Sequence, residues 1–220
     1  MDLQRAYLEA NGGLANIQAL SSLILDGVIT NAEGEAYEFK LYKKRPDLMR
    51  MQIDLPQGSQ LTVFDGRRGF ELLSRRGEAA RLVELDVDAS EKAKFEAGID
   101  GIFYHLRGRS EWLEVVSEVE IEGKPAFEIV ISEAADLPYE RIWVGTEHFQ
   151  EVKLRRKASS EAGREHLEEI YFSDFEQIRG VWLAKTARFE RDGNFFQGVC
   201  INKVRANVGL FDSLFEKPKI

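Results

Sequence analysis

The stretch "YKKRPDLMRMQI", residues 42–53, has three basic residues just before a proline and a segment rich in apolar residues after it. After Pro46, apolar side chains alternate with charged and polar ones. Because successive side chains of a strand point to opposite faces, this alternation predicts a strand with one apolar and one polar face. The predicted apolar face continues past the quoted stretch and carries Met49, Met51, Ile53 and Leu55.

The same two-residue period recurs on both sides of this stretch. Upstream, residues 23–30 and 36–44 alternate in the same way, and glycine-containing turns separate short alternating segments downstream. No helix alternates with these strands as it would in a parallel βαβ chain. Because a sheet of about ten strands tends to curl or close, the sequence predicts a mainly β, α+β fold with a curled antiparallel sheet of about 10–11 strands.

Two parts of the chain show the spacing of helices instead. Residues 2–10 form an amphipathic pattern that ends at Asn11-Gly12-Gly13, and a second pattern begins near residue 88, where Asp88 is the predicted cap. Gly98 and Gly101 weaken this second pattern, so two short helices or one kinked helix are expected. The apolar residues of this central segment are Phe95, Ile99, Ile102, Phe103 and Leu106.

Length and composition limit the class of protein. The 220 residues contain no linker-like run, so a single domain over residues 1–220 is predicted. The net charge of -8 argues against general nucleic-acid binding, which needs a basic surface. The single cysteine, Cys200, lies in an apolar run and is predicted to be buried. No stretch approaches the roughly 18 apolar residues of a membrane helix.

The sequence contains no motif that indicates a cofactor or a catalytic nucleophile. Glycine-rich phosphate motifs and the nucleophile elbow are absent, and His105, His148 and His166 are scattered. We therefore expect no catalytic residues, no metal, no cofactor and no enzymatic activity. A pair of carboxylates acting as acid and base stays open as a third hypothesis, that of a hydrolase.

Four stretches resemble one known family. They are "YLEANGGLANIQALSSLILDGVI" (7–29), the stretch 42–53, "FDGRRGFEL" (64–72) and "NVGLFDSLFEKP" (207–218). Their order along the chain is similar to that of LolA-like proteins, the bacterial outer-membrane lipoprotein carriers and sorting proteins. One departure is Ala184, which stands where the family often has proline.

The resemblance implies an incomplete, half β-barrel with an N-terminal helix and a central helical lid over a hydrophobic cavity. It implies a periplasmic binding or carrier protein for lipid or lipoprotein acyl chains. Peripheral membrane contact and an envelope protein partner are compatible with it, whereas a transmembrane segment and nucleic acid are not expected. The residues expected to line the cavity and lid are Phe39, Leu41, Met49, Met51, Ile53, Phe95, Ile99, Ile102 and Phe103.

Two alternatives stay open at this point. The family also contains envelope sensors, so a sensor or interaction domain that acts through a surface is the alternative function. The start of the sequence has no apolar signal region. Either a signal peptide was removed before Met1 and the protein is periplasmic, or the protein is cytoplasmic.

Overall fold

The strands form one antiparallel sheet in a computed structural model that describes residues 3–159 and 165–220. Within these ranges there are 13 strands, and their order in the sheet is β6-β5-β4-β3-β2-β1-β13-β12-β11-β10-β9-β8-β7. The two ends of this order, β6 and β7, are not paired with each other, so the sheet is not closed into a barrel. The strand number exceeds the predicted 10–11.

The strands are β1 (Ser22–Asn31), β2 (Ala36–Lys44), β3 (Leu48–Leu55), β4 (Gly58–Phe64), β5 (Gly69–Arg75), β6 (Arg81–Glu84), β7 (Leu113–Ile121), β8 (Lys124–Ile131), β9 (Arg141–Gly145), β10 (Glu151–Ser159), β11 (Glu165–Ile178), β12 (Val181–Arg191) and β13 (Asn194–Ala206). The helices are α1 (Leu3–Ala10), α2 (Gly13–Ala19), α3 (Val87–Ala97) and α4 (Ile102–His105), with 3-10 turns η1 (Ser110–Trp112), η2 (Glu133–Ala135) and η3 (Asp212–Phe215). The mainly β fold class predicted from the sequence is confirmed.

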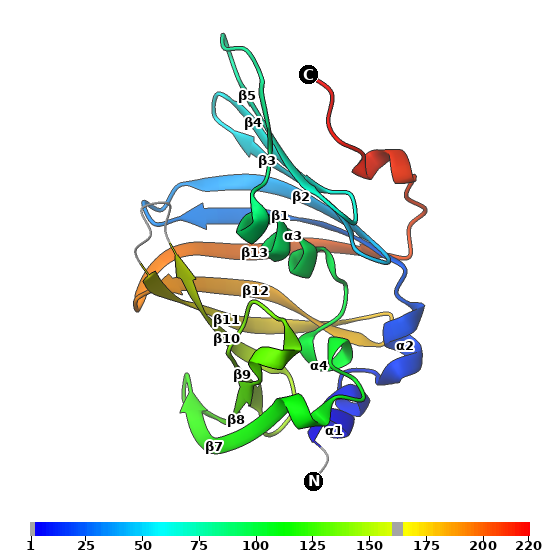
Figure 1. Cartoon of the computed structure of the whole chain (residues 1–220), viewed down its shortest axis with the longest axis vertical. Coiled ribbons are helices and arrows are strands. Elements are labelled where there is room, and N and C mark those ends of the chain that lie inside the picture. Colours follow the sequence, from blue (N-terminus) through cyan, green and yellow to red (C-terminus); the bar gives the residue numbers. More distant parts are fainter. Residues whose placement is uncertain (1–2, 160–164) are drawn as a thin grey trace. The chain divides into compact units, whose positions relative to one another are not determined.

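Contacts along the chain divide it into two compact units. The first unit comprises Met1–Gln18 and Asp100–Val199, and the second comprises Ala19–Ile99 and Cys200–Ile220. The second unit contains β1–β6 and α3, and the first contains α1, α4 and β7–β12 (Figure 1). The expectation of a single domain stays a prediction.

In the second unit, β1–β5 follow one another as hairpins, in blue and cyan in Figure 1. Antiparallel partners lie on the same face of a sheet. Leu41 is the partner of Met51, and Phe39 is the partner of Ile53. Met49 belongs to the same face because it lies two residues before Met51. We refer to Phe39, Leu41, Met49, Met51 and Ile53 as the α3 face.

Different segments cover the two faces of this sheet. Helix α3 contacts β3, β4 and β5 on the α3 face. On the opposite face, Val63 and Phe70 are partners and are fully buried. The C-terminal segment reaches this side, since η3 contacts β3 and the Lys217 ammonium lies 5.3 Å from the centre of the Phe70 ring. The segment therefore acts as a second cover.

The first unit has its own core under α1 and α4. Ile102, Phe103 and Leu106 are almost fully buried, as are Ile129 and Ile142 of β8 and β9. The ring of Tyr7 in α1 stacks on that of Phe103 in α4, with 4.4 Å between their centres. The N-terminal helix is thus packed on the central helical segment within this unit.

Two local predictions are corrected by the structure. The cap of α3 is Asp86, whose carboxylate accepts a hydrogen bond from the Ala89 amide at 2.8 Å, whereas Asp88 lies in the first turn. Cys200 is exposed, in a strand whose residues are all exposed or half-buried. The predicted break near Gly98 and Gly101 is confirmed, since α3 and α4 are separate helices.

Candidate functional site

The α3 face brings together five of the residues predicted to bind a ligand. Phe39 and Met49 are buried, whereas Leu41, Met51 and Ile53 are half-buried. The alternation of β2 and β3 is unbroken over this region, which is why one face collects all five side chains. That they bind a ligand stays a prediction.

Helix α3 meets one end of this face through small side chains. Ala93 and Ala97 are buried against Met49 and Phe64, and Leu41 packs against the same cluster. The two alanines are four residues apart and therefore lie on the same side of the helix. Because an alanine buries little apolar area, the direct contact between α3 and the sheet is thin.

The other predicted lid residues divide between the two units. Phe95 and Ile99 belong to the second unit and are half-buried. Ile102 and Phe103 belong to the first unit, where both are fully buried in its core. The residues predicted as one lid are therefore two groups, and only the first group shares a unit with the α3 face.

The basic corner beside Pro46 holds three backbone segments. The Lys43 ammonium donates a hydrogen bond to the carbonyl of Gly98, just after α3, at 2.9 Å. Lys44 donates to the carbonyl of Leu210 at 2.7 Å, and Arg45 donates to that of Leu20. Each cation thus donates a hydrogen bond to a carbonyl that lies outside the helices and strands. The local sequence does not indicate this role.

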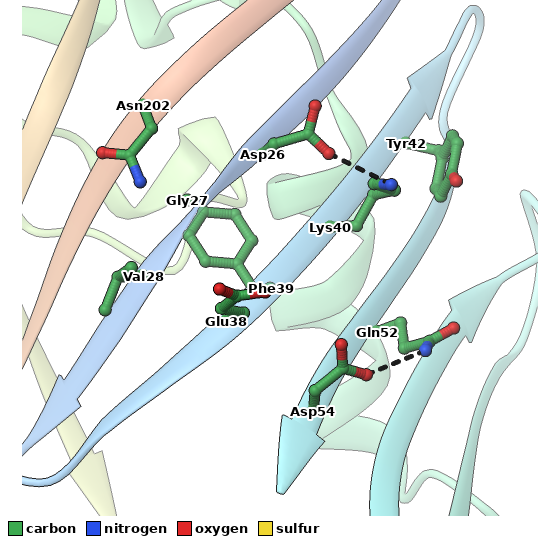
Figure 2. Close-up of a pocket in the computed structure, with 10 residues that line it drawn as sticks. All are labelled: Asp26, Gly27, Val28, Glu38, Phe39, Lys40, Tyr42, Gln52, Asp54 and Asn202. Carbon is green, nitrogen blue, oxygen red and sulfur yellow. Dashed lines mark hydrogen bonds and ion pairs between the residues drawn. The ribbon is translucent and has the colours of Figure 1, made fainter.

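A polar pocket of about 370 Å³ opens on the other face of the same sheet (Figure 2). Its charged and amide side chains come from β1, β2, β3 and β13, which pair side by side. We refer to this side of the sheet as the pocket face. The lining residues are Asp26, Gly27, Val28, Glu38, Phe39, Lys40, Tyr42, Gln52, Asp54 and Asn202.

Acidic groups dominate the charge of the pocket. Asp26 is paired with Lys40 and with Arg205, each at 3.3 Å. Asp54 accepts a hydrogen bond from Gln52 at 3.0 Å, and Glu38 has no ion-pair partner within the described residues. A lining of this kind suits polar or cationic groups and disfavours an acyl chain.

Gly27 lines the pocket and is the β1 partner of Phe39 in β2. A Cβ atom at this position would lie 2.6 Å from the Phe39 ring and 2.3 Å from the carbonyl oxygen of Cys200. Glycine therefore lets the Phe39 ring lie directly against β1, while β13 approaches from the side. This close packing holds the Phe39 ring against β1.

Alternation alone could have indicated the polar side of β2 and β3, but not the pocket, because Asp26 and Asn202 are brought together by the pairing of β1 with β13.

Among the described residues, no three His, Cys, Asp or Glu side chains are arranged to hold a metal ion. In the same residues, every helix is too short or too polar to span a bilayer.

Comparison with known proteins gives similarity at the level of structure. No family model matches the sequence, and no curated protein matches it. A DUF1329 family protein from Desulfovibrio piger has a TM-score of 0.58 and 17% identity, over 97% of this chain and 95% of that chain. A LolA superfamily protein from Nitrosomonas europaea has a TM-score of 0.57 and 14% identity, over 96% of each chain.

These two structures show the fold, because identities this low do not transfer an activity. The chain has a LolA-like fold, as the resemblance of its sequence motifs predicted.

Proposed function

We propose that the protein is a non-enzymatic binding or carrier protein for the acyl chains of lipids or lipoproteins in the bacterial periplasm. The observation that carries this proposal is the α3 face, where five apolar side chains share one surface under a helix that touches only part of it. The LolA-like fold supports the assignment to the cell envelope.

The chemistry of the α3 face suits an acyl chain. A chain of methylenes offers no hydrogen bonds, and its burial contributes about 0.8 kcal/mol per methylene. Met51 and Ile53 keep part of their surface exposed, so there is apolar area left to cover. Methionine also adapts its shape to different chains, which a carrier of several ligands requires.

Release requires that the cover be weakly held. The buried side chains through which α3 meets the sheet cluster are Ala93 and Ala97. Phe95 within α3 and Ile99 just after it are half-buried. In this proposal the segment from α3 to Ile99 moves aside when an acyl chain enters along Met51 and Ile53.

Binding of a fluorescent long-chain fatty acid tests the proposal, together with native mass spectrometry of the purified protein for retained lipid. Met51→Arg places a guanidinium on the α3 face and is expected to raise the Kd at least about tenfold, which corresponds to ~1.4 kcal/mol. Ser59→Arg is the matched control, because Ser59 is the partner of Asp54 on the opposite face. Equal binding by wild type and Met51→Arg, or no binding by any form, would overturn the proposal.

The polar pocket favours one alternative, a sensor or interaction domain that acts through its surface. In that case an envelope protein contacts the pocket face, and the α3 face is only core. Lys40→Glu, which breaks the pair with Asp26, would then abolish capture of the partner from envelope extracts while fatty-acid binding stays absent.

A further inference from the structure

Glu151 lies at the start of β10, between α1 and α4 of the first unit. Its carboxylate accepts a hydrogen bond from the Ile102 amide at 3.0 Å and another from the Phe103 amide. The hydroxyl of Tyr7 in α1 also bonds to it. One side chain therefore joins β10, α1 and α4.

The packing is tight between this carboxylate and Gly101. A Cβ atom at Gly101 would lie 2.5 Å from the Tyr7 hydroxyl and 2.6 Å from Oε1 of Glu151. Gln4 closes the other side of α4, because its amide donates to the Leu106 carbonyl at 2.8 Å. The joint between α1 and α4 is thus built around a half-buried glutamate whose carboxylate lies against Tyr7 and Gly101.

The charges around Glu151 do not compensate for its burial. Burial raises the pKa of Glu151 to about 7, although the hydrogen bonds from Tyr7, Ile102 and Phe103 act in the opposite direction. Asp100 lies just before α4 and adds negative charge near Tyr7. The β9 partner of Glu151 is Val144, which is apolar, and no basic side chain is paired with Glu151 within the described residues.

We propose that Glu151 is a proton-operated latch, which holds α4 on α1 and β10 when its carboxyl is neutral and loosens residues 101–106 when it ionises. The proposal does not rest on acyl-chain binding, since every group involved lies in the first unit and outside the α3 face. It adds a pH-dependent step to the fold whether or not the protein is a carrier.

The sign of the effect follows from linkage between folding and proton binding. Glu151 has a pKa of about 7 when buried, against 4.5 for an ordinary glutamate, so opening of the latch releases a proton between these values. The stabilisation is complete below the lower value and is lost as the pH rises through the higher one. The opening equilibrium should rise by up to about tenfold per pH unit over this window and level off above it.

Hydrogen exchange of the Ile102 and Phe103 amides, corrected for the intrinsic pH dependence of exchange, measures this opening. Wild-type protein should lose protection as the pH rises between the two values and reach a plateau above neutral pH. Glu151→Gln keeps an acceptor for the Ile102 amide but does not titrate, so its protection should be independent of pH. Glu147→Gln, an exposed carboxylate on the preceding turn, is the matched control and should behave like wild type.

Carbon-13 NMR titration of the Glu151 carboxyl in the wild-type protein gives a second measurement that does not depend on the folding of a variant. A midpoint near neutral pH that coincides with the loss of amide protection supports the latch. A midpoint near that of an ordinary glutamate, or equal pH dependence in wild type and Glu151→Gln, would overturn it.

Discussion

The two units of this chain cover their strands with helices in different ways. In the first unit, α4 inserts Ile102 and Phe103 into the core and is further held by hydrogen bonds to Gln4 and Glu151. In the second unit, the buried residues of α3 are Ala93 and Ala97. The first arrangement is typical of a permanent core, whereas the second leaves a helix that can separate from its sheet at lower cost.

Because of this difference, the central helical segment consists of two parts that are held to the molecule unequally. A continuous lid would carry all of its apolar residues over one cavity. Instead, the segment is anchored at α4, and the stretch from α3 to Ile99 is the part with a thin contact. If the chain carries acyl groups, α3 is the element expected to move.

The largest effect is expected from Phe103→Ala. This change removes a fully buried ring that stacks on Tyr7, so the free energy of unfolding should fall by about 3–5 kcal/mol. Phe95→Ala removes the same side chain from half-buried α3 and should cost less than half as much. Urea denaturation of both variants measures the comparison, and equal losses would contradict the distinction between the two covers.

An intermediate effect is expected from Ala97→Leu. Ala97 is fully buried in the cluster with Met49 and Phe64, so a larger side chain should push α3 from the sheet at a cost of about 1–3 kcal/mol. Lys94→Leu, at an exposed position of the same helix, should stay within about 0.5 kcal/mol of wild type. Hydrogen exchange should report the loss in α3 amides and leave those of α4 unchanged.

The smallest effect is expected at the start of α3. Asp86→Ala removes the hydrogen bond to the Ala89 amide and should destabilise the helix by about 1 kcal/mol. Asp88→Ala removes only a favourable charge in the first turn, which is worth about 0.3–1 kcal/mol. Circular dichroism during thermal unfolding compares the two variants. A larger effect of Asp88→Ala would indicate that Asp88, the cap predicted from the sequence, is the true cap.

The α3 face could be predicted from the sequence because its information is local. Alternation through β2 and β3 fixes which side chains share a face, and Pro46 marks the break between the strands. The cap of α3 could not be fixed, because Asp86 and Asp88 both precede amides at capping distance along the chain. The order of neighbouring residues does not decide between them.

The features that could not be predicted from the sequence depend on contacts between residues far apart in the chain. The pocket needs β1 beside β13, which places Asp26 near Asn202 across most of the chain. Likewise, Ile102 and Phe103 have the same helical spacing as Phe95 and Ile99, yet they pack on α1 in the other unit. Periodicity gives the apolar side of an element but not the partner that covers it.

The exposed position of Cys200 gives this protein a ready reporter group. It is the single thiol of the chain, and its sulfur lies 3.9 Å from the amide oxygen of Asn202 at the pocket. A maleimide fluorophore attached there would sense occupancy of the pocket face while the α3 face stays chemically untouched. Emission changes upon adding fatty acid or envelope extract would thus tell, in native-sequence protein, which side of the sheet is in use.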